Sequence, residues 1–294
     1  MIQLTCHSEY GKIQSLFIKK AGDAFHSSTY IDEQWKDLNY LGKPSFTGSV
    51  SEYAAFEAIL GAYAEQISCF PMDPSVTMDS IYCRDASIST NNGMIICNMG
   101  KVLRSEEPPA AARAFEKNNI RILGGIRSPG TVEGGDVAWL DEHTLAVGHT
   151  YRSNETGIAQ LRQILEPLGV ELLVAALPHY KGQGDVFHLM SILSPVDKDL
   201  VVVYSPLMPI AFRNELPRRN YQLVEVPETE FESMGCNVLA LAPRVCLMVT
   251  GNPITRSRLE KAGCKVIEYK GEEISMKGGG GPTCLTRPIK RYVQ

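Results

Sequence analysis

A pattern that returns about every fifty residues constrains what this chain can fold into. In each unit, a polar or reactive residue precedes an apolar strand, a turn and a second apolar strand. The residues that open these units lie 47 to 52 positions apart, and they are Asp85, Asp136, His188, Asn237 and Cys284. A period of this size is typical of one supersecondary unit in a propeller or a repeat array.

The segments between these hairpins complete the unit. Apolar periodicity and Gly, Pro or polar capping residues predict helices over 51–64, 108–118, 153–168 and 252–263. Single strands are predicted over 120–123, 170–175, 222–226 and 265–269. Ser153 is expected to cap its helix. The strand over 13–19 supplies what the truncated last unit lacks, so both chain ends should share one blade. The predicted fold class is α/β, a single-domain propeller over residues 1–294.

The composition excludes several classes of protein. With 44% apolar and 21% charged residues, the chain is globular rather than disordered or a coiled coil. A net charge of −4 provides no overall cationic field for nucleic acid or an acidic membrane surface. The longest apolar stretches fall far short of the roughly 20 residues that span a bilayer. We therefore expect neither a nucleic-acid partner nor a membrane partner.

The cysteines and the first residues indicate a compartment. The eight cysteines are scattered without CxxC pairs, which is typical of a reduced cytosolic protein. Residues 1–9 lack the basic and apolar regions of a targeting signal, so we expect a cytoplasmic protein. The histidines other than His188 show no ligand spacing, and no nucleotide-binding glycine motif occurs. No metal and no cofactor are therefore predicted.

Residues at equivalent positions of a propeller face a common axis, so the opening residues should line one central cavity. With Glu133, they provide a thiol, an imidazole and several carboxylates. A thiolate is a strong nucleophile when its surroundings lower its pKa, and the imidazole of His188 can act as a general acid and base. The four glycines over 278–281 before Cys284 allow close backbone approach, positive φ and free amide groups.

The acidic residues predicted around this cavity favour a cationic substrate. A guanidinium is a planar cation that donates paired hydrogen bonds to carboxylates. Carboxylates beside its nitrogens would hold its carbon over the sulfur of Cys284. A small-molecule guanidino compound is therefore the expected partner, and a homodimer is left open.

At these residues the chain resembles the guanidino-group-modifying (pentein) superfamily. This superfamily includes dimethylarginine dimethylaminohydrolases, arginine and agmatine deiminases, and amidinotransferases. The matching motifs occur in family order, and they cover residues 78–85, 132–136, 147–157, 187–191 and 278–284. The resemblance extends over nearly the whole chain and implies a propeller of five ββαβ blades.

The resemblance also implies roles for seven residues. Cys284 is expected to attack the guanidinium carbon and form a covalent thiouronium. His188 is expected to protonate the departing amine and then to activate water. Asp85 and Glu133 match carboxylates that hold guanidinium nitrogens. The remaining three match residues that bind other parts of the substrate. Asp79 matches a polar contact, and Arg104 and Arg152 match cations that bind the carboxylate of the amino acid.

The motifs leave several activities open. In the resembled deiminases that act on unsubstituted arginine, the position of Met190 is occupied by an aspartate. The thioether of Met190 leaves room for an N-alkyl group on the substrate. Arg84, in contrast, is similar to the arginine deiminase pattern. We predict hydrolysis of arginine or an Nω-methylated arginine to citrulline and an amine. The alternatives are an arginine deiminase or dihydrolase, an amidinotransferase, and a non-catalytic protein that binds a guanidino ligand.

Two further segments have specific interpretations. Asp136 completes the Glu-Gly-Gly-Asp turn, and we interpret it as structural rather than catalytic. Residues 35–44 have no regular pattern. They are expected either to lie over the cavity or to pack on the surface.

Overall fold

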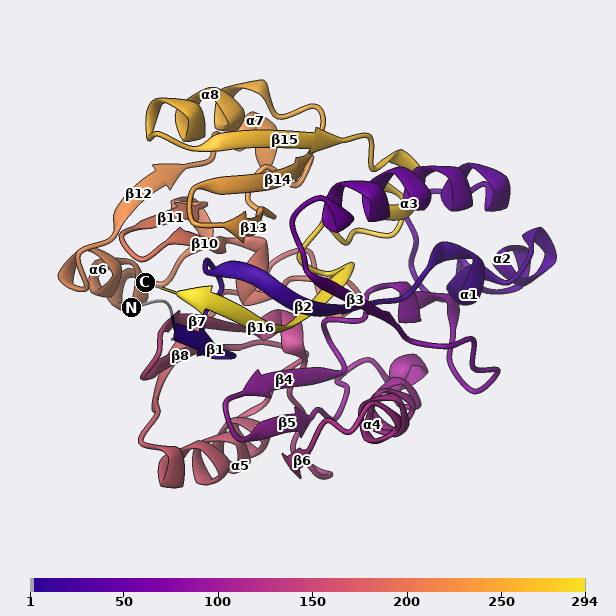
Figure 1. Ribbon diagram of the computed structural model, residues 1–294, viewed down its shortest axis with the longest axis horizontal. Helices are drawn as coiled ribbons and strands as arrows, with labels where there is room; N and C mark the ends of the chain where they lie inside the picture. Colours follow the sequence, from indigo (N-terminus) through magenta and orange to yellow (C-terminus); the bar gives the residue numbers. More distant parts are fainter. Residues whose placement is uncertain (1–2, 294) are drawn as a thin grey trace.

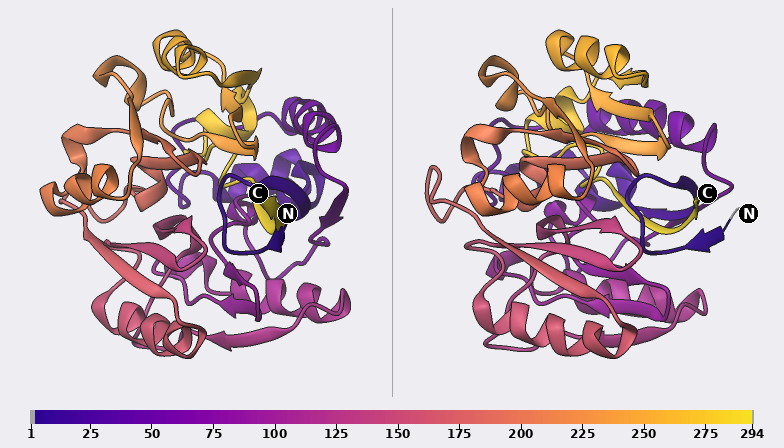
Figure 2. Two further views of the ribbon diagram at one scale, coloured as in Figure 1. Left: turned by 60° about the vertical axis from the view of Figure 1, so that its left-hand side comes forward. Right: turned by 90° about the vertical axis from the view of Figure 1, so that its left-hand side faces the viewer.

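Five small β-sheets form the body of the protein in the computed structural model, which describes residues 3–293 (Figures 1 and 2). Four sheets have three strands and one has four. In each three-stranded sheet, an antiparallel hairpin is followed by a helix and by a third strand parallel to the second. This is the order of elements that the sequence predicts.

The four complete units follow one another along the chain. The first contains β4 (Ser87–Thr90), β5 (Gly93–Ile96), α4 (Glu107–Lys117) and β6 (Ile122–Gly125). The second contains β7 (Val137–Asp141), β8 (Thr144–His149), α5 (Glu155–Leu165) and β9 (Glu171–Ala176). The third contains β10 (Leu193–Asp197), β11 (Leu200–Val203), α6 (Ile210–Arg218) and β12 (Gln222–Glu225). After the short helix α7 (Glu228–Phe231), the fourth contains β13 (Leu239–Ala242), β14 (Val245–Val249), α8 (Pro253–Lys261) and β15 (Lys265–Tyr269).

The fifth sheet joins the two ends of the chain. Its strands are ordered β1 (Gln3–Thr5), β16 (Thr286–Val293), β2 (Lys12–Ile18) and β3 (Gln66–Cys69). Strand β16 is antiparallel to both of its neighbours. The helices α1 (Ala21–Phe25), α2 (Ser28–Gln34) and α3 (Phe46–Gly61) connect β2 to β3. The prediction that both chain ends share one blade is confirmed, and Figure 1 shows β1 beside β16.

Neighbouring sheets contact one another around a ring. These contacts join β7 to β10, β10 to β13, β13 to β2, and β16 to β4. Between the first and second units, Trp139 Nε1 donates to the carbonyl of Ser89, and Asn98 forms an isolated bridge with Val132. The sheets therefore close into a five-bladed α/β propeller, and the predicted fold class is confirmed.

Apolar residues hold the sheets and the outer helices together. Every residue of β11 is buried, as expected for the middle strand of a sheet that is covered on both faces. Helix α5 buries Ile158, Leu161 and Leu165, which repeat at helical spacing on the face turned to its sheet. Figures 1 and 2 show the long helices at the periphery. None of the helices within residues 3–293 is both long and apolar enough to cross a membrane.

Two helix starts differ from the prediction. The side chain of Asn154 caps α5 by accepting from the Gly157 amide, so the prediction that Ser153 is the cap is wrong. The Ser153 hydroxyl donates instead to Asp136 Oδ2 at 2.6 Å. Helix α3 begins several residues earlier than predicted, because the Ser45 side chain accepts from the Gly48 amide and caps it there.

Candidate active site

A pocket of about 810 Å³ opens at the starts of the hairpins. Four of the five opening residues line it, which are Asp85, His188, Asn237 and Cys284. The fifth, Asp136, is fully buried behind them. Leu38, Asn39 and Leu41 form part of the rim, so the interpretation of residues 35–44 as a loop over the cavity is confirmed.

Cys284 lies at the floor of this pocket, two residues before β16. Its side chain is half-buried, and its Sγ lies 3.4 Å from Asn237 Nδ2. Burial and the negative charge of Asp85 raise the pKa of the thiol. Hydrogen bonds from Asn237 and Thr283 act in the opposite direction and lower this pKa.

The glycine run before Cys284 serves close packing against side chains. A Cβ atom at Gly278 or Gly280 would collide with the ring of Tyr82. Gly279 has φ +80°, a conformation that favours glycine. The amides of Gly279 and Gly280 both donate to the Ser275 carbonyl. The prediction that these amides are free to face an anion is therefore wrong for these two residues.

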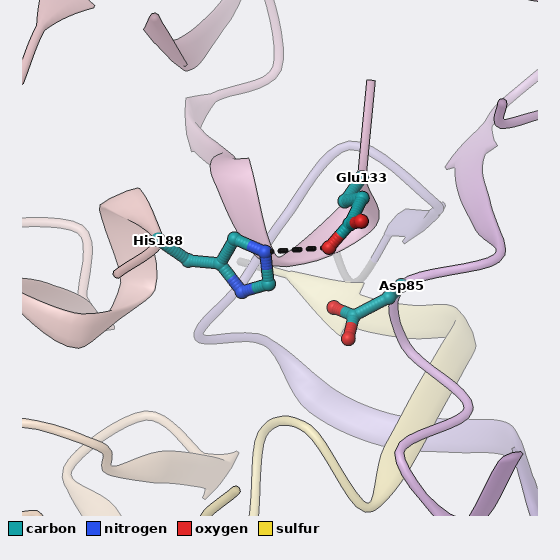
Figure 3. Close-up of side chains that lie close together, drawn as sticks. All are labelled: Asp85, Glu133 and His188. Atoms are coloured by element: carbon teal, nitrogen blue, oxygen red, sulfur yellow. Dashed lines mark hydrogen bonds and ion pairs between the residues drawn. The ribbon is translucent and has the colours of Figure 1, made fainter. Parts of the chain in front are cut away.

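His188, which lines the same pocket as Cys284, forms a buried ion pair with Glu133 (Figure 3). His188 Nε2 donates to Glu133 Oε2 at 2.8 Å, and the dashed line in Figure 3 marks this bond. Glu133 is completely buried and also accepts from the Lys101 amide and from Arg152 Nη1. The sequence analysis predicts that Glu133 holds substrate nitrogens. The structure instead places its carboxylate behind His188, where these donors already occupy it.

The surroundings of His188 favour its protonated form. Burial alone would lower the pKa of the imidazole, but the carboxylates of Asp136, Asp85 and Glu133 outweigh burial and raise this pKa to about 9. Asp136 is held in place by the Leu189 amide on Oδ1 and by Ser153 on Oδ2. At neutral pH, His188 therefore carries a proton that it can donate into the pocket.

Asp85 lines the pocket and, among the described residues, has one unpaired carboxylate oxygen. Its Oδ2 accepts from Arg104 Nη1 at 2.6 Å, whereas its buried Oδ1 has no hydrogen-bond partner within residues 3–293. A Cβ atom at Gly135 would collide with both this Oδ1 and His188 Nδ1, so only glycine lets the two groups approach (Figure 3). A buried carboxylate oxygen in this position is an acceptor for an N–H group of a ligand.

Arg104 does not have the surroundings that its predicted role requires. Its guanidinium donates to Glu107 through Nε and Nη2 at 2.8 and 2.7 Å, and to Asp85 through Nη1. Its Nη2 also donates to the Tyr82 carbonyl at 3.0 Å. These bonds leave little capacity for a substrate carboxylate. Arg104 is better placed to hold Asp85 in position.

The other two predicted contacts are buried residues of the pocket lining. Asp79 and Arg152 both line it, and Arg152 Nη1 lies 3.2 Å from Glu133 Oε2. Lys101 is not among the residues predicted from the sequence, and its Nζ donates to Asp79 Oδ2 at 2.6 Å and to the Leu38 carbonyl at 2.7 Å. Asn237 has no predicted role either, although the repeat places this residue in phase with Cys284.

The site also contains three residues of the types that bind metal ions, which are Asp85, Glu133 and His188. One ligand atom from each lies within 4.8 Å of the others. However, a metal needs a neutral imidazole, and the carboxylates around His188 favour its protonated form. The arrangement suits an acid–base pair and a cationic ligand better than a metal ion.

Comparison with known proteins identifies the family of this chain. The model of the family described as "N,N dimethylarginine dimethylhydrolase, eukaryotic" matches residues 30–291. The chain belongs to this family. The dimethylarginine dimethylhydrolase family consists of hydrolases that act on C–N bonds of guanidino compounds, so the chain is a guanidino-modifying amidinohydrolase.

Relatives and solved structures extend this comparison. The N(G),N(G)-dimethylarginine dimethylaminohydrolase of Pseudomonas aeruginosa is 26% identical over 248 residues, which are 84% of this chain and 91% of that protein. A structure of the P. aeruginosa enzyme, a mutant complexed with citrulline, has a TM-score of 0.75 at 22% identity and covers 95% of this chain and 100% of its own. The N-terminal domain of ArgZ, a cyanobacterial arginine dihydrolase, has a TM-score of 0.80 at 18% identity, with 94% and 98% coverage. Both structures share the pentein fold of this family.

Proposed function

We propose that this protein hydrolyses an Nω-methylated arginine to citrulline and an amine through a thiouronium on Cys284. The observation that carries the proposal is the unpartnered Oδ1 of Asp85, a residue that lines the same pocket as the thiol of Cys284 and the protonated imidazole of His188. An N–H group of a guanidinium would satisfy this oxygen and bring the guanidinium carbon near the sulfur.

In the first half of this reaction, the thiolate of Cys284 adds to the guanidinium carbon. The tetrahedral adduct then expels the substituted nitrogen, which leaves as an amine with the proton of His188. The remaining group is a thiouronium on the sulfur. In the second half, the now neutral His188 takes a proton from water, and the resulting hydroxide adds to the same carbon. Collapse of this adduct expels the thiolate, and loss of the hydroxyl proton to the released amine or to water gives citrulline.

Substrate binding itself promotes ionisation of the nucleophile. Burial and Asp85 raise the pKa of the Cys284 thiol in the free protein. A bound guanidinium neutralises the field of Asp85 at the sulfur, because the cation lies beside both groups. The thiolate therefore forms where its reaction partner is already in place.

The remaining charged groups at the pocket fit the amino-acid end of the substrate. Arg152 lines the pocket and uses Nη1 to bind Glu133, and its remaining guanidinium donors could bind a carboxylate. Asp79, paired with Lys101, supplies a polar contact beside it. We assign Arg104 to the positioning of Asp85 rather than to a direct substrate contact.

Met190 favours a methylated substrate. It lines the pocket close to His188 and presents a thioether where a carboxylate would add a second grip on an unsubstituted guanidinium. Arginine deiminase or dihydrolase activity is the second candidate, supported by the fold shared with ArgZ.

Product analysis tests the proposed function. Purified protein is incubated separately with asymmetric dimethylarginine, arginine, agmatine and citrulline, and the products are identified by mass spectrometry. We expect citrulline and dimethylamine from dimethylarginine. If arginine gives ammonia and dimethylarginine gives no dimethylamine, the proposed hydrolysis of a methylated arginine is wrong and the protein is an arginine deiminase. Tight binding without any turnover would indicate a binding protein.

The dependence of kcat/KM on pH should be bell-shaped. The rate is expected to rise with pH as the Cys284 thiol ionises and to level off near pH 9, where His188 loses the proton that the departing amine needs. It should fall above the raised pKa of the thiol, because the thiol is then fully ionised while His188 continues to lose its proton. Glu133→Gln removes a carboxylate that raises the pKa of His188, so the rising limb should level off at lower pH. An unchanged rising limb in this variant would contradict the assignment of His188 as the acid.

A further inference from the structure

Asn237 occupies the opening position of the fourth unit and faces the nucleophile. It lines the pocket, and only 8% of its surface is exposed. Its Oδ1 accepts from the amide and the hydroxyl of Thr283 at 3.1 and 2.8 Å. These two donors fix the orientation of the side-chain amide, because only its oxygen can accept them. The NH₂ group must therefore face Cys284, and Nδ2 lies 3.4 Å from Sγ.

The last glycine before the nucleophile makes room for this amide. A Cβ atom at Gly281 would collide with both Oδ1 and Cγ of Asn237. Two residues next to Cys284 thus position the side-chain amide of Asn237. Gly281 leaves space for it, and Thr283 fixes its orientation. Such a combined fit is expected for a group whose position relative to the sulfur matters.

The pocket must stabilise a thiolate and also bind a cation, and a neutral hydrogen-bond donor is compatible with both. A thiolate is stabilised by a nearby positive charge, but a lysine or arginine beside the sulfur would repel the guanidinium substrate. A side-chain amide donates a hydrogen bond to the thiolate without carrying a net charge. Asn237 can therefore favour the thiolate while the pocket stays attractive for a cation.

We infer that Asn237 is a further catalytic residue, which stabilises the thiolate of Cys284 by donating a hydrogen bond from its side-chain amide to the sulfur. This inference rests on the proposed function in one respect, which is that Cys284 is the nucleophile. It also fits the balance of effects on the pKa of Cys284, because the Asn237 bond opposes the rise that burial and Asp85 cause.

The ionisation of Cys284 in the free protein tests this inference. Iodoacetamide alkylates thiolates, and mass spectrometry of the peptide that contains Cys284 separates it from the other cysteines. Asn237→Asp keeps the size of the side chain and an oxygen for Thr283, but it replaces the donor with a negatively charged acceptor. We expect its alkylation profile to move to higher pH and the rate at neutral pH to fall at least about tenfold.

Two other variants make the experiment decisive. Asn237→Ala removes the donor without adding charge, so a smaller shift in the same direction is expected even if Asn237→Asp folds poorly. Asn92→Asp makes the matched change at an exposed position of the turn between β4 and β5, and it should leave the profile unchanged.

The outcomes separate this inference from the proposed function. A wild-type alkylation profile in both folded Asn237 variants would overturn the inference, even if the protein hydrolyses dimethylarginine. Conversely, the Asn237 variants can shift the profile in a protein that converts none of the guanidino compounds. In that case the thiolate contact stands and the proposed function fails.

Discussion

Cys284→Ser is expected to reduce hydrolysis of the guanidino substrate by at least about four orders of magnitude, with the fold and substrate binding retained. A hydroxyl occupies nearly the same space as a thiol, so the chain between Thr283 and β16 should not change. The hydroxyl is, however, much harder to ionise beside the negative charge of Asp85. Turnover assays measure the loss of activity, and isothermal titration calorimetry measures the retained binding.

The matched control for this variant is Cys69→Ser. Cys69 is an exposed free cysteine at the end of β3, so the same substitution there should leave turnover unchanged. Activity of Cys284→Ser above about one per cent of the wild-type value would contradict a covalent route through this sulfur. Loss of substrate binding would place Cys284 in recognition rather than in chemistry.

The repeat made most of the propeller predictable. Its hairpins and helices are encoded by local patterns, and β15 begins and ends at the predicted residues, Lys265 and Tyr269. Helix α6 was missed, because it contains Pro217 near its end and has no capping side chain at its start. The tertiary packing of Phe212 and Leu216 stabilises this helix, and the local sequence does not show that packing.

Long-range polar contacts explain the wrong prediction at the start of α5. Ser153 and Asn154 are both good capping residues, so the sequence alone does not choose between them. In the structure, the Ser153 hydroxyl bonds to Asp136, which precedes β7. Asn154 is then the residue that is left to cap the helix.

The position of the site was more predictable than the pairing within it. Equal phase in the repeat placed Asp85, His188 and Cys284 around one pocket, as the structure does. Which cation pairs with which carboxylate depends on rotamers and neighbours that no spacing reveals. For this reason Arg104 was expected at the substrate and instead holds Asp85, whereas Lys101 was not considered.

His188→Gly should have the second large effect, a fall in steady-state turnover of at least about a thousandfold. The imidazole acts in both halves of the proposed reaction, first as the acid for the departing amine and then as the base for water. The two steps do not depend on it equally. An expelled amine is a strong base and can take a proton from water that enters the vacated space, whereas attack by water on the thiouronium needs a base. A covalent adduct on Cys284 should therefore accumulate.

The mass of this adduct tests the order of the steps. Dimethylarginine and arginine differ only in the nitrogen that leaves, so both should add the same mass to the Cys284 peptide of the variant. An adduct that retains the methyl groups would show that His188 is required before the amine departs, which contradicts the proposed order. His143→Gly is the matched control, because His143 is exposed on the turn between β7 and β8 and should support wild-type turnover. Undiminished turnover in His188→Gly would refute the proton-transfer role, since the ion pair with Glu133 would then serve structure alone.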